Sequence, residues 1–323
     1  MKILQNASSH ILAVSTSLIV VFSGHATAVA DPSPDAQAAI EAVDTATAVA
    51  EKGSIPSSYS QESGTVPAEI SLPAAGSTET KIVDEELGTL SISAHEGDVT
   101  TRDGVSVIQG NQTTVAQERD NGSVQYSAVL NEDGKTQQTY TLSGDFDFTL
   151  EETPSEAIEI VAVGENHPSG SPRIVYGTIE KPWAIDADGN HLPTSYSIEG
   201  KTITQRVDTT GATYPVVADP RVTFGRGVYV NMTGAELNAL ASSSGIILGG
   251  SGVVACSVVE KMKIPSWPKL LLGALCSAVG TKIATEIVKE SLKPGRYRFT
   301  QCYQMRYPSD NRGFVAVGAE NCK

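Results

Sequence analysis

The sequence predicts an α+β protein. An N-terminal antiparallel β-sandwich or barrel is followed by a smaller disulfide-stabilised domain with a helical hairpin and a short C-terminal β-hairpin. Short segments of strand character, separated by turn residues, fill residues 81–220. Two apolar segments of helical length and all four cysteines follow them. Dense short strands are typical of sandwiches and barrels, and an even cysteine count is typical of disulfide-linked domains.

The first thirty residues have the features of a signal peptide. Lys2 supplies a positive charge, and residues 11–22 form a short apolar core. Ala28 and Ala30 lie three residues and one residue before a cleavage site at Asp31, and signal peptidase requires small side chains at these −3 and −1 positions. Because a membrane anchor needs about 20 apolar residues, we favour cleavage before Asp31. We therefore expect a secreted or cell-envelope-associated protein.

Residues 31–80 are rich in Ala, Ser, Thr, Pro and Glu. Apolar residues recur at helical spacing from Asp35 to about Ala50, which predicts a short helix with Asp35 as its cap. From Gly53 to Thr80 this periodicity vanishes, which predicts a low-complexity linker.

Residues 81–220 form the predicted acidic β domain. Segments 123–130 and 135–142 flank the sequence Asn-Glu-Asp-Gly, whose Asp133-Gly134 pair suits the positive dihedral angles of a tight hairpin. Further strands are predicted at residues 90–93, 105–108, 146–150, 158–163, 174–178, 196–198 and 202–207.

The last part of the chain, residues 221–323, forms the predicted basic helical-hairpin domain. A Thr-Gly-Ala-Glu sequence at residues 233–236 fits a capping box, in which the two polar side chains satisfy backbone N–H groups where a helix begins. The apolar segments 245–259 and 270–288 follow, and the two prolines between them interrupt the helix.

The two parts of the chain carry opposite charges. The formal net charge is −14, yet residues 221–323 hold 13 Lys and Arg against 6 Asp and Glu, whereas residues 1–220 hold 10 against 31. A basic segment on an exported protein attracts anionic lipid or wall polymer, and opposite charges favour docking of the acidic domain on the basic one. We expect these partners and no nucleic acid; simple solvation of both parts is the alternative.

The four cysteines allow three disulfide connectivities. We favour disulfides over a zinc site because the chain has no CxxC spacing and the basic part has no histidine. Cys256 and Cys276 stand ten residues either side of residue 266, so an antiparallel hairpin would bring them together. Cys302 and Cys322 have the same relation to residue 312, and we predict the pairs 256–276 and 302–322.

The apolar hairpin has two interpretations. A buried hairpin in a disulfide-linked domain is favoured, because 15 residues in the first segment are short for a bilayer. The alternative is a membrane-active hairpin that inserts after export. The spacing of Gly245 and Gly249 is one that lets helices approach closely in lipid.

Three runs of sequence resemble a recurrent module of exported actinobacterial proteins. They are AIDADGNHLPTSY at residues 184–196, GKTITQRV at residues 200–207 and YPVVADP at residues 214–220. In that family a Cys-containing helical region similarly follows the module. The likeness covers roughly residues 175–323 and implies a secreted actinobacterial origin, with no activity to assign to individual residues.

Catalytic signatures are absent from the sequence. It contains no GxSxG, no HExxH and no complete P-loop, and the Gly-Lys-Thr runs at 134–136 and 200–202 are interpreted as hairpin turns. Asp186, Asp188 and Asn190 offer oxygens to a hard cation but lack the distal Glu of an EF-hand, which favours a plain turn. We predict no catalytic, cofactor-binding or metal-binding residue, although a glycosidase-like carboxylate pair would escape this search.

We therefore expect a non-enzymatic exported protein that acts at a cell-envelope, membrane or partner surface. Three alternatives stay open. The first is a membrane-active, bacteriocin-like effector held by an acidic pro-domain until cleavage near Ala218, Asp219, Pro220 and Arg221. The others are an envelope-binding or adhesive protein and an enzyme of unrecognised type.

Overall fold

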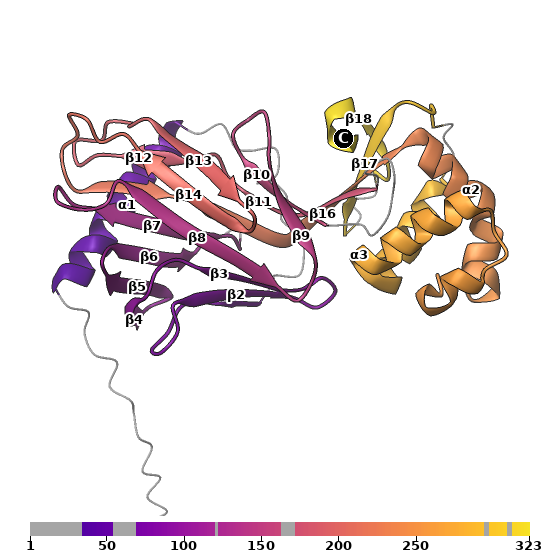
Figure 1. Ribbon diagram of the computed structural model, residues 1–323, viewed down its shortest axis with the longest axis horizontal. Coiled ribbons are helices and arrows are strands. Elements are labelled where there is room, and N and C mark those ends of the chain that lie inside the picture. The colour runs from indigo at the N-terminus through magenta and orange to yellow at the C-terminus, as the bar shows by residue number, and fades with distance from the viewer. Residues whose placement is uncertain (1–33, 54–68, 120–121, 163–171, 294–296, 309–311) are drawn as a thin grey trace, which may run out of the picture. The chain divides into compact units, whose positions relative to one another are not determined.

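A computed structural model shows two facing β-sheets, a helix against the larger sheet and two helices later in the chain (Figure 1). The proposed cleavage site at Ala28, Ala30 and Asp31 lies outside the described residues, as does segment 54–68 of the expected linker. All described residues belong to one compact unit, Asp31–Lys323. The structure describes residues 34–53, 69–119, 122–162, 172–293, 297–308 and 312–323.

The smaller sheet has one face in the core and one in solvent. Strand β8 shows this best, because its side chains alternate between buried and exposed positions, as a half-buried strand requires. Among the described residues its strands, in spatial order, are β1 (Glu69–Ser71), β2 (Glu79–Asp84), β3 (Gly88–Ser93), β8 (Gln137–Gly144), β14 (Thr202–Val207) and β13 (Thr194–Glu199). Strands β1 and β2 show that regular structure begins before residue 81.

The larger sheet has several strands that are buried on both faces, unlike β8 of the smaller sheet. Its main path is β4 (Gly97–Arg102), β5 (Val105–Gly110), β6 (Thr113–Glu118), β7 (Val124–Leu130), β16 (Arg221–Thr233), β11 (Arg173–Ile179), β10 (Ile158–Ala162) and β9 (Phe148–Glu152). Strand β15 (Val216–Asp219) pairs with β7 and with β12 (Trp183–Ile185). The strand pairings in both sheets are antiparallel, which confirms the predicted antiparallel β-sandwich or barrel, and the two separate sheets correspond to the sandwich.

The predicted hairpin of segments 123–130 and 135–142 is wrong. Strand β7 pairs with β6, β15 and β16, whereas β8 pairs with β3 and β14 of the other sheet. The loop at Asp133-Gly134 therefore connects the two sheets, and neither residue has a positive φ. Burial explains the separation, since every residue of β7 is buried and β8 has a solvent-facing side.

Two-residue turns make the tight hairpins instead. Asp103 and Gly104 have φ values of 48° and 80° and join β4 to β5, the geometry that an Asp-Gly turn favours. Gly200, with φ of 58°, and Lys201 join β13 to β14, as interpreted from the sequence. The interpretation of residues 134–136 as a hairpin turn is wrong, because the strands on either side of them belong to different sheets.

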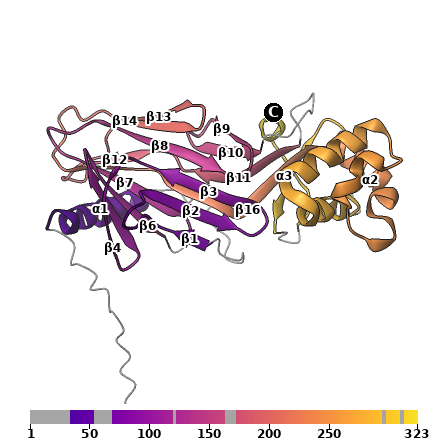
Figure 2. The ribbon, with the colours of Figure 1, turned by 60° about the horizontal axis from the view of Figure 1, so that its bottom comes forward.

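Helix α1 (Pro34–Gly53) packs on the larger sheet through small side chains. The proline at its first position needs no N–H partner there. The alanine-rich face allows the helix to lie close to the sheet and completes the burial of β7 (Figure 2). Its contact residues are Ala36, Ala39, Val43, Ala46 and Ala50 on the helix and Val107, Val115, Val129, Ile185 and Val217 on the sheet.

Strand β16 leads directly into α2 (Gly234–Leu248), which begins with the predicted capping box. Thr233 Oγ1 accepts from the backbone N–H of Glu236, and the Glu236 carboxylate accepts from the backbone N–H of Thr233. The helix ends at Leu248, because Gly249 takes a φ of 52°. The expected helix over residues 245–259 is therefore wrong, and most of that segment forms turns and the 3₁₀ helices Gly249–Ser251 and Cys256–Lys261.

Helix α3 (Ser266–Ser291) packs beside α2 and completes the helical hairpin (Figures 1 and 2). Pro265 occupies the N-cap position of this helix without a side-chain capping bond. Pro268 lies in the first turn, where a missing N–H costs no hydrogen bond. Gly280 interrupts it with a φ of 67°. The predicted C-terminal β-hairpin is formed by β17 (Cys302–Tyr307) and β18 (Val315–Val317).

Strand β16 joins the parts that the sequence separates at residue 220. It pairs with β7 and β11 on the acidic side and with β17 on the basic side. One cluster of buried apolar residues accordingly runs from both sheets into α2 and α3. The Tyr176 hydroxyl donates to the Ala278 carbonyl oxygen at 2.6 Å, and the Tyr307 hydroxyl donates to Glu86 Oε2 at 2.6 Å.

Candidate functional site: an apolar and basic surface

Two disulfides form between the predicted cysteine partners. Cys256 bonds to Cys276 with Cα atoms 5.5 Å apart, and Cys302 bonds to Cys322 with Cα atoms 5.9 Å apart. The geometry of the first bond differs from the expected pair of facing helices. Cys256 lies in a 3₁₀ helix, which the bond holds against α3.

This bond positions a surface that combines exposed apolar and cationic side chains. Val258, Trp267 and Leu270 are 39%, 41% and 51% exposed. The Lys269 ammonium donates to the Glu260 carbonyl oxygen at 3.2 Å, which ties the 3₁₀ helix to the start of α3. We call this region the Trp267 surface and define it by Val258, Lys261, Lys263, Trp267, Lys269 and Leu270.

The charge of the Trp267 surface is positive. Lys261 and Lys263 are exposed, and no ion pair joins either of them to a carboxylate in the described part of the chain. Glu260 is the one acidic residue between residues 237 and 285. A tryptophan ring with flanking lysines is the side-chain combination that lies at the boundary between lipid headgroups and acyl chains.

Helix α3 is itself apolar enough to be compared with a membrane span. Among the described helices it alone has the length and composition for one, over Ser266–Ser291, although 56% of its most apolar window is buried. A core helix has the same properties, and Leu271, Leu272 and Leu275 face the core here. Leu270 and Trp267 are exposed large apolar side chains of this helix and can contact another surface.

The glycine spacing at Gly245 and Gly249 does not bring helices together in this structure. A Cβ built at either position has open space around it. No neighbouring helix therefore packs closely against these two glycines in the described part of the chain.

The candidate processing boundary is buried. Ala218 and Asp219 are each 1% exposed, because β15 is paired on both edges, with β7 and with β12. The neighbouring Arg221 begins β16. A protease needs an extended, accessible segment, so cleavage here requires β15 to leave the sheet first.

Charged residues surround this boundary in a way that the sequence did not reveal. The Glu51 carboxylate of α1 accepts from Arg119 at 3.0 Å and from Arg221 at 3.1 Å. Burial raises the pKa of the Asp219 carboxyl well above its usual value, against the opposing effect of Arg221. Asp219 Oδ2 has no hydrogen-bond partner among the residues described here. The Glu51 side chain is half exposed, whereas Asp219 is buried. The ion pairs of Glu51 anchor α1 to the larger sheet, so we assign this cluster to stability.

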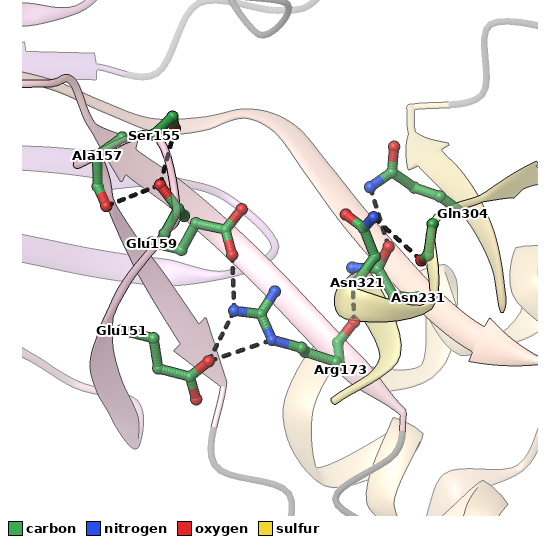
Figure 3. A network of polar contacts seen from close by, with 10 residues as sticks. Glu151, Ser155, Ala157, Glu159, Arg173, Asn231, Gln304 and Asn321 are labelled. Atoms are coloured by element: carbon green, nitrogen blue, oxygen red, sulfur yellow. Dashed lines mark hydrogen bonds and ion pairs between the residues drawn. The ribbon is translucent and has the colours of Figure 1, made fainter.

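A second polar cluster runs across neighbouring strands of the larger sheet, from β9 to the C-terminal strand β17 (Figure 3). Arg173 pairs with Glu159 at 2.6 Å and with Glu151 at 2.7 Å across neighbouring strands. The Asn231 amide donates to the Arg173 carbonyl oxygen, and the Gln304 amide donates to Asn231 Oδ1. Because its members satisfy one another within the sheet, the cluster is structural.

The Asp186 loop is a turn, as favoured from the sequence. Its carboxylate accepts from the backbone N–H groups of Asp188 and Asn190 and from the Asn190 side-chain amide. No cluster of metal-ligating residues occurs in the described ranges.

The comparisons with known proteins assign no family to the chain: no family model matches it, and neither does a curated protein or a solved structure. The resemblance to exported actinobacterial proteins therefore stays a prediction. In the structure its three sequence runs form β12, β13, β14 and β15, which lie in both sheets.

Proposed function

We propose that this protein is a non-enzymatic exported protein that binds anionic membrane surfaces through the Trp267 surface. The observation that carries the proposal is the placement of exposed Trp267 and Leu270 beside three lysines on a segment held by a disulfide. Exposed apolar side chains and nearby lysines both favour binding to an anionic membrane, because apolar side chains enter the headgroup region while ammonium groups remain near lipid phosphates.

The expected binding is peripheral and reversible. Partial burial of a few apolar side chains contributes on the order of 2–4 kcal/mol, and each lysine near an anionic surface adds about 1 kcal/mol. The core-facing side of α3 stays packed in the protein, so this interaction requires no unfolding.

Vesicle co-sedimentation of the chain from Asp31 to Lys323 tests the proposal. We expect binding to phosphatidylglycerol-containing vesicles, little binding to pure phosphatidylcholine vesicles, and weakening at high salt because ionic attraction is screened. The double variant Trp267→Ala, Leu270→Ala should bind at least about tenfold more weakly. Phe299→Ala is the matched control, since Phe299 is 70% exposed and its carbonyl contacts the start of α2.

Three results would reject the proposal: no binding, equal binding to both vesicle types, or an equal loss in the Phe299 control. Release of an entrapped dye at the binding concentration would instead identify a membrane-permeabilising effector.

A further inference from the structure

A polar groove lies at one end of the smaller sheet, remote in sequence from the Trp267 surface. Its volume is about 420 Å³, within the range of small-ligand sites. Arg206 of β14 pairs with Gln137 of β8 on one side and with Ser195 of β13 on the other. All three residues are exposed, so their polar groups form a row across three strands.

Hydrogen bonds hold this groove in a defined shape. The Val207 N–H donates to the Thr136 carbonyl oxygen, and the Asp208 N–H donates to the Pro193 carbonyl oxygen, both at 2.9 Å. The Thr194 hydroxyl donates to the backbone carbonyl oxygen of Arg206, also at 2.9 Å. These bonds fix the ends of the three strands, so a ligand meets a preformed site.

The groove offers donors, acceptors and one apolar wall. No ion pair joins Arg206 to a carboxylate within the described ranges. Asp208 Oδ1 accepts from the backbone and hydroxyl of Thr210, and these bonds lower the pKa of Asp208, which keeps it ionised as an acceptor. The exposed Pro193 ring adds a flat apolar surface.

A sugar has the matching chemistry. Neighbouring hydroxyls on a sugar ring both donate and accept, so planar Arg, Gln and Asp side chains bind them in pairs, and the ring's C–H face packs on apolar surface. An anionic ligand is disfavoured, because Glu132 and Asp133 precede the groove and residues 1–220 carry a net charge of −21.

We propose that this groove binds a neutral oligosaccharide. The proposal is independent of membrane binding, since it uses different residues on different elements. It assigns Arg206 and Gln137 as the principal hydrogen-bonding side chains and Pro193 as the surface under the sugar ring.

Calorimetric titration of the Asp31–Lys323 chain tests this inference. The probes are neutral tetrasaccharides, β-1,4-linked N-acetylglucosamine and β-1,4-linked glucose, with tetragalacturonate as the anionic counterpart. We expect saturable binding of at least one neutral probe and binding at least about tenfold weaker in Arg206→Ala and in Gln137→Ala. Arg102→Ala is the charge-matched control, because it removes an exposed guanidinium from β4 of the other sheet.

Unchanged unfolding temperatures would show that the groove variants still fold. The inference is overturned if no neutral probe binds, if tetragalacturonate binds more tightly than both, or if Arg102→Ala weakens binding as much as Arg206→Ala. Vesicle binding by Arg206→Ala should equal that of the unmodified chain.

Discussion

At the scale of single residues, Asp219 is a carboxyl group buried within the larger sheet. It lies on β15, which pairs with β7 and β12, and burial raises the pKa of this carboxyl well above its usual value. The side chain is inaccessible, so we assign it to stability and not to catalysis.

Asp219 predicts a pH dependence of stability. Because the pKa of its carboxyl in the folded chain lies above the ordinary value of 3.8, the unfolded chain releases this proton first as the pH rises. Folding stability at this position should therefore decline from about pH 4 upward, until the folded carboxyl ionises. In Asp219→Asn this decline should be absent, so the variant's stability relative to the natural chain should increase with pH. Urea unfolding at a series of pH values measures this, and parallel curves for the two proteins would contradict it.

Local sequence signals predicted several residues correctly, but not those that depend on distant partners. The capping box at Thr233 and Glu236 works within one helical turn, and its partners are fixed by spacing. The Glu51 bridge to Arg119 and Arg221 spans more than half the chain, and no local pattern indicates it.

At the scale of elements, the Cys256–Cys276 bond determines the position of the Trp267 surface. Its loop and that of Cys302–Cys322 both span 20 residues. Loop closure entropy therefore predicts similar losses of unfolding free energy, about 3 kcal/mol, when either pair is changed to serine. Urea unfolding checks this, and an unchanged midpoint in either variant would be the opposite result.

The two serine variants should differ in local stability. Trypsin cleavage after Lys261 and Lys263 should accelerate when the 256–276 bond is absent. Lys261 ends the 3₁₀ helix that this bond holds against α3, and Lys263 follows it by two residues. Loss of the 302–322 bond should leave cleavage at these sites unchanged. Equal acceleration of cleavage in both variants would contradict this prediction, because it would show that either lost bond destabilises the whole fold.

The errors at this scale have a common cause. Asp133-Gly134 indicated a turn correctly, but a turn signal does not say which sheet the next strand joins. Uninterrupted burial in β7 and alternating burial in β8 place those strands in different surroundings. For residues 245–259, apolar composition suggested a helix, but Gly249 and Gly252 adopt positive φ and end it.

At the scale of the whole molecule, β16 makes the sheets and the helices part of one hydrophobic core. We therefore expect residues 34–323 to unfold cooperatively with the disulfides intact. Trp183 lies in β12 and Trp267 lies in α3, so a single-tryptophan variant reports on each region. Coincident urea transitions for Trp183→Phe and Trp267→Phe are the expected result, and separate midpoints would show that residues 221–323 fold by themselves.

The fold class could be predicted because strand periodicity, capping and cysteine spacing are all local. The binding surfaces could not be predicted. In the sequence Trp267 lies in the segment that connects two apolar runs, and only the 256–276 bond and the core packing determine which of its side chains face outward. The groove at Arg206 likewise depends on the pairing of the β13–β14 hairpin with β8, a strand that is distant in sequence.

Contact between Trp267 and lipid tests the account most directly. In Trp183→Phe, Trp267 is the sole tryptophan, and brominated lipid quenches its fluorescence only when the ring enters the headgroup and acyl boundary. We predict a blue shift and quenching with anionic brominated vesicles and neither with zwitterionic ones. An unshifted, unquenched signal while the protein co-sediments with anionic vesicles would contradict the assignment of the Trp267 surface.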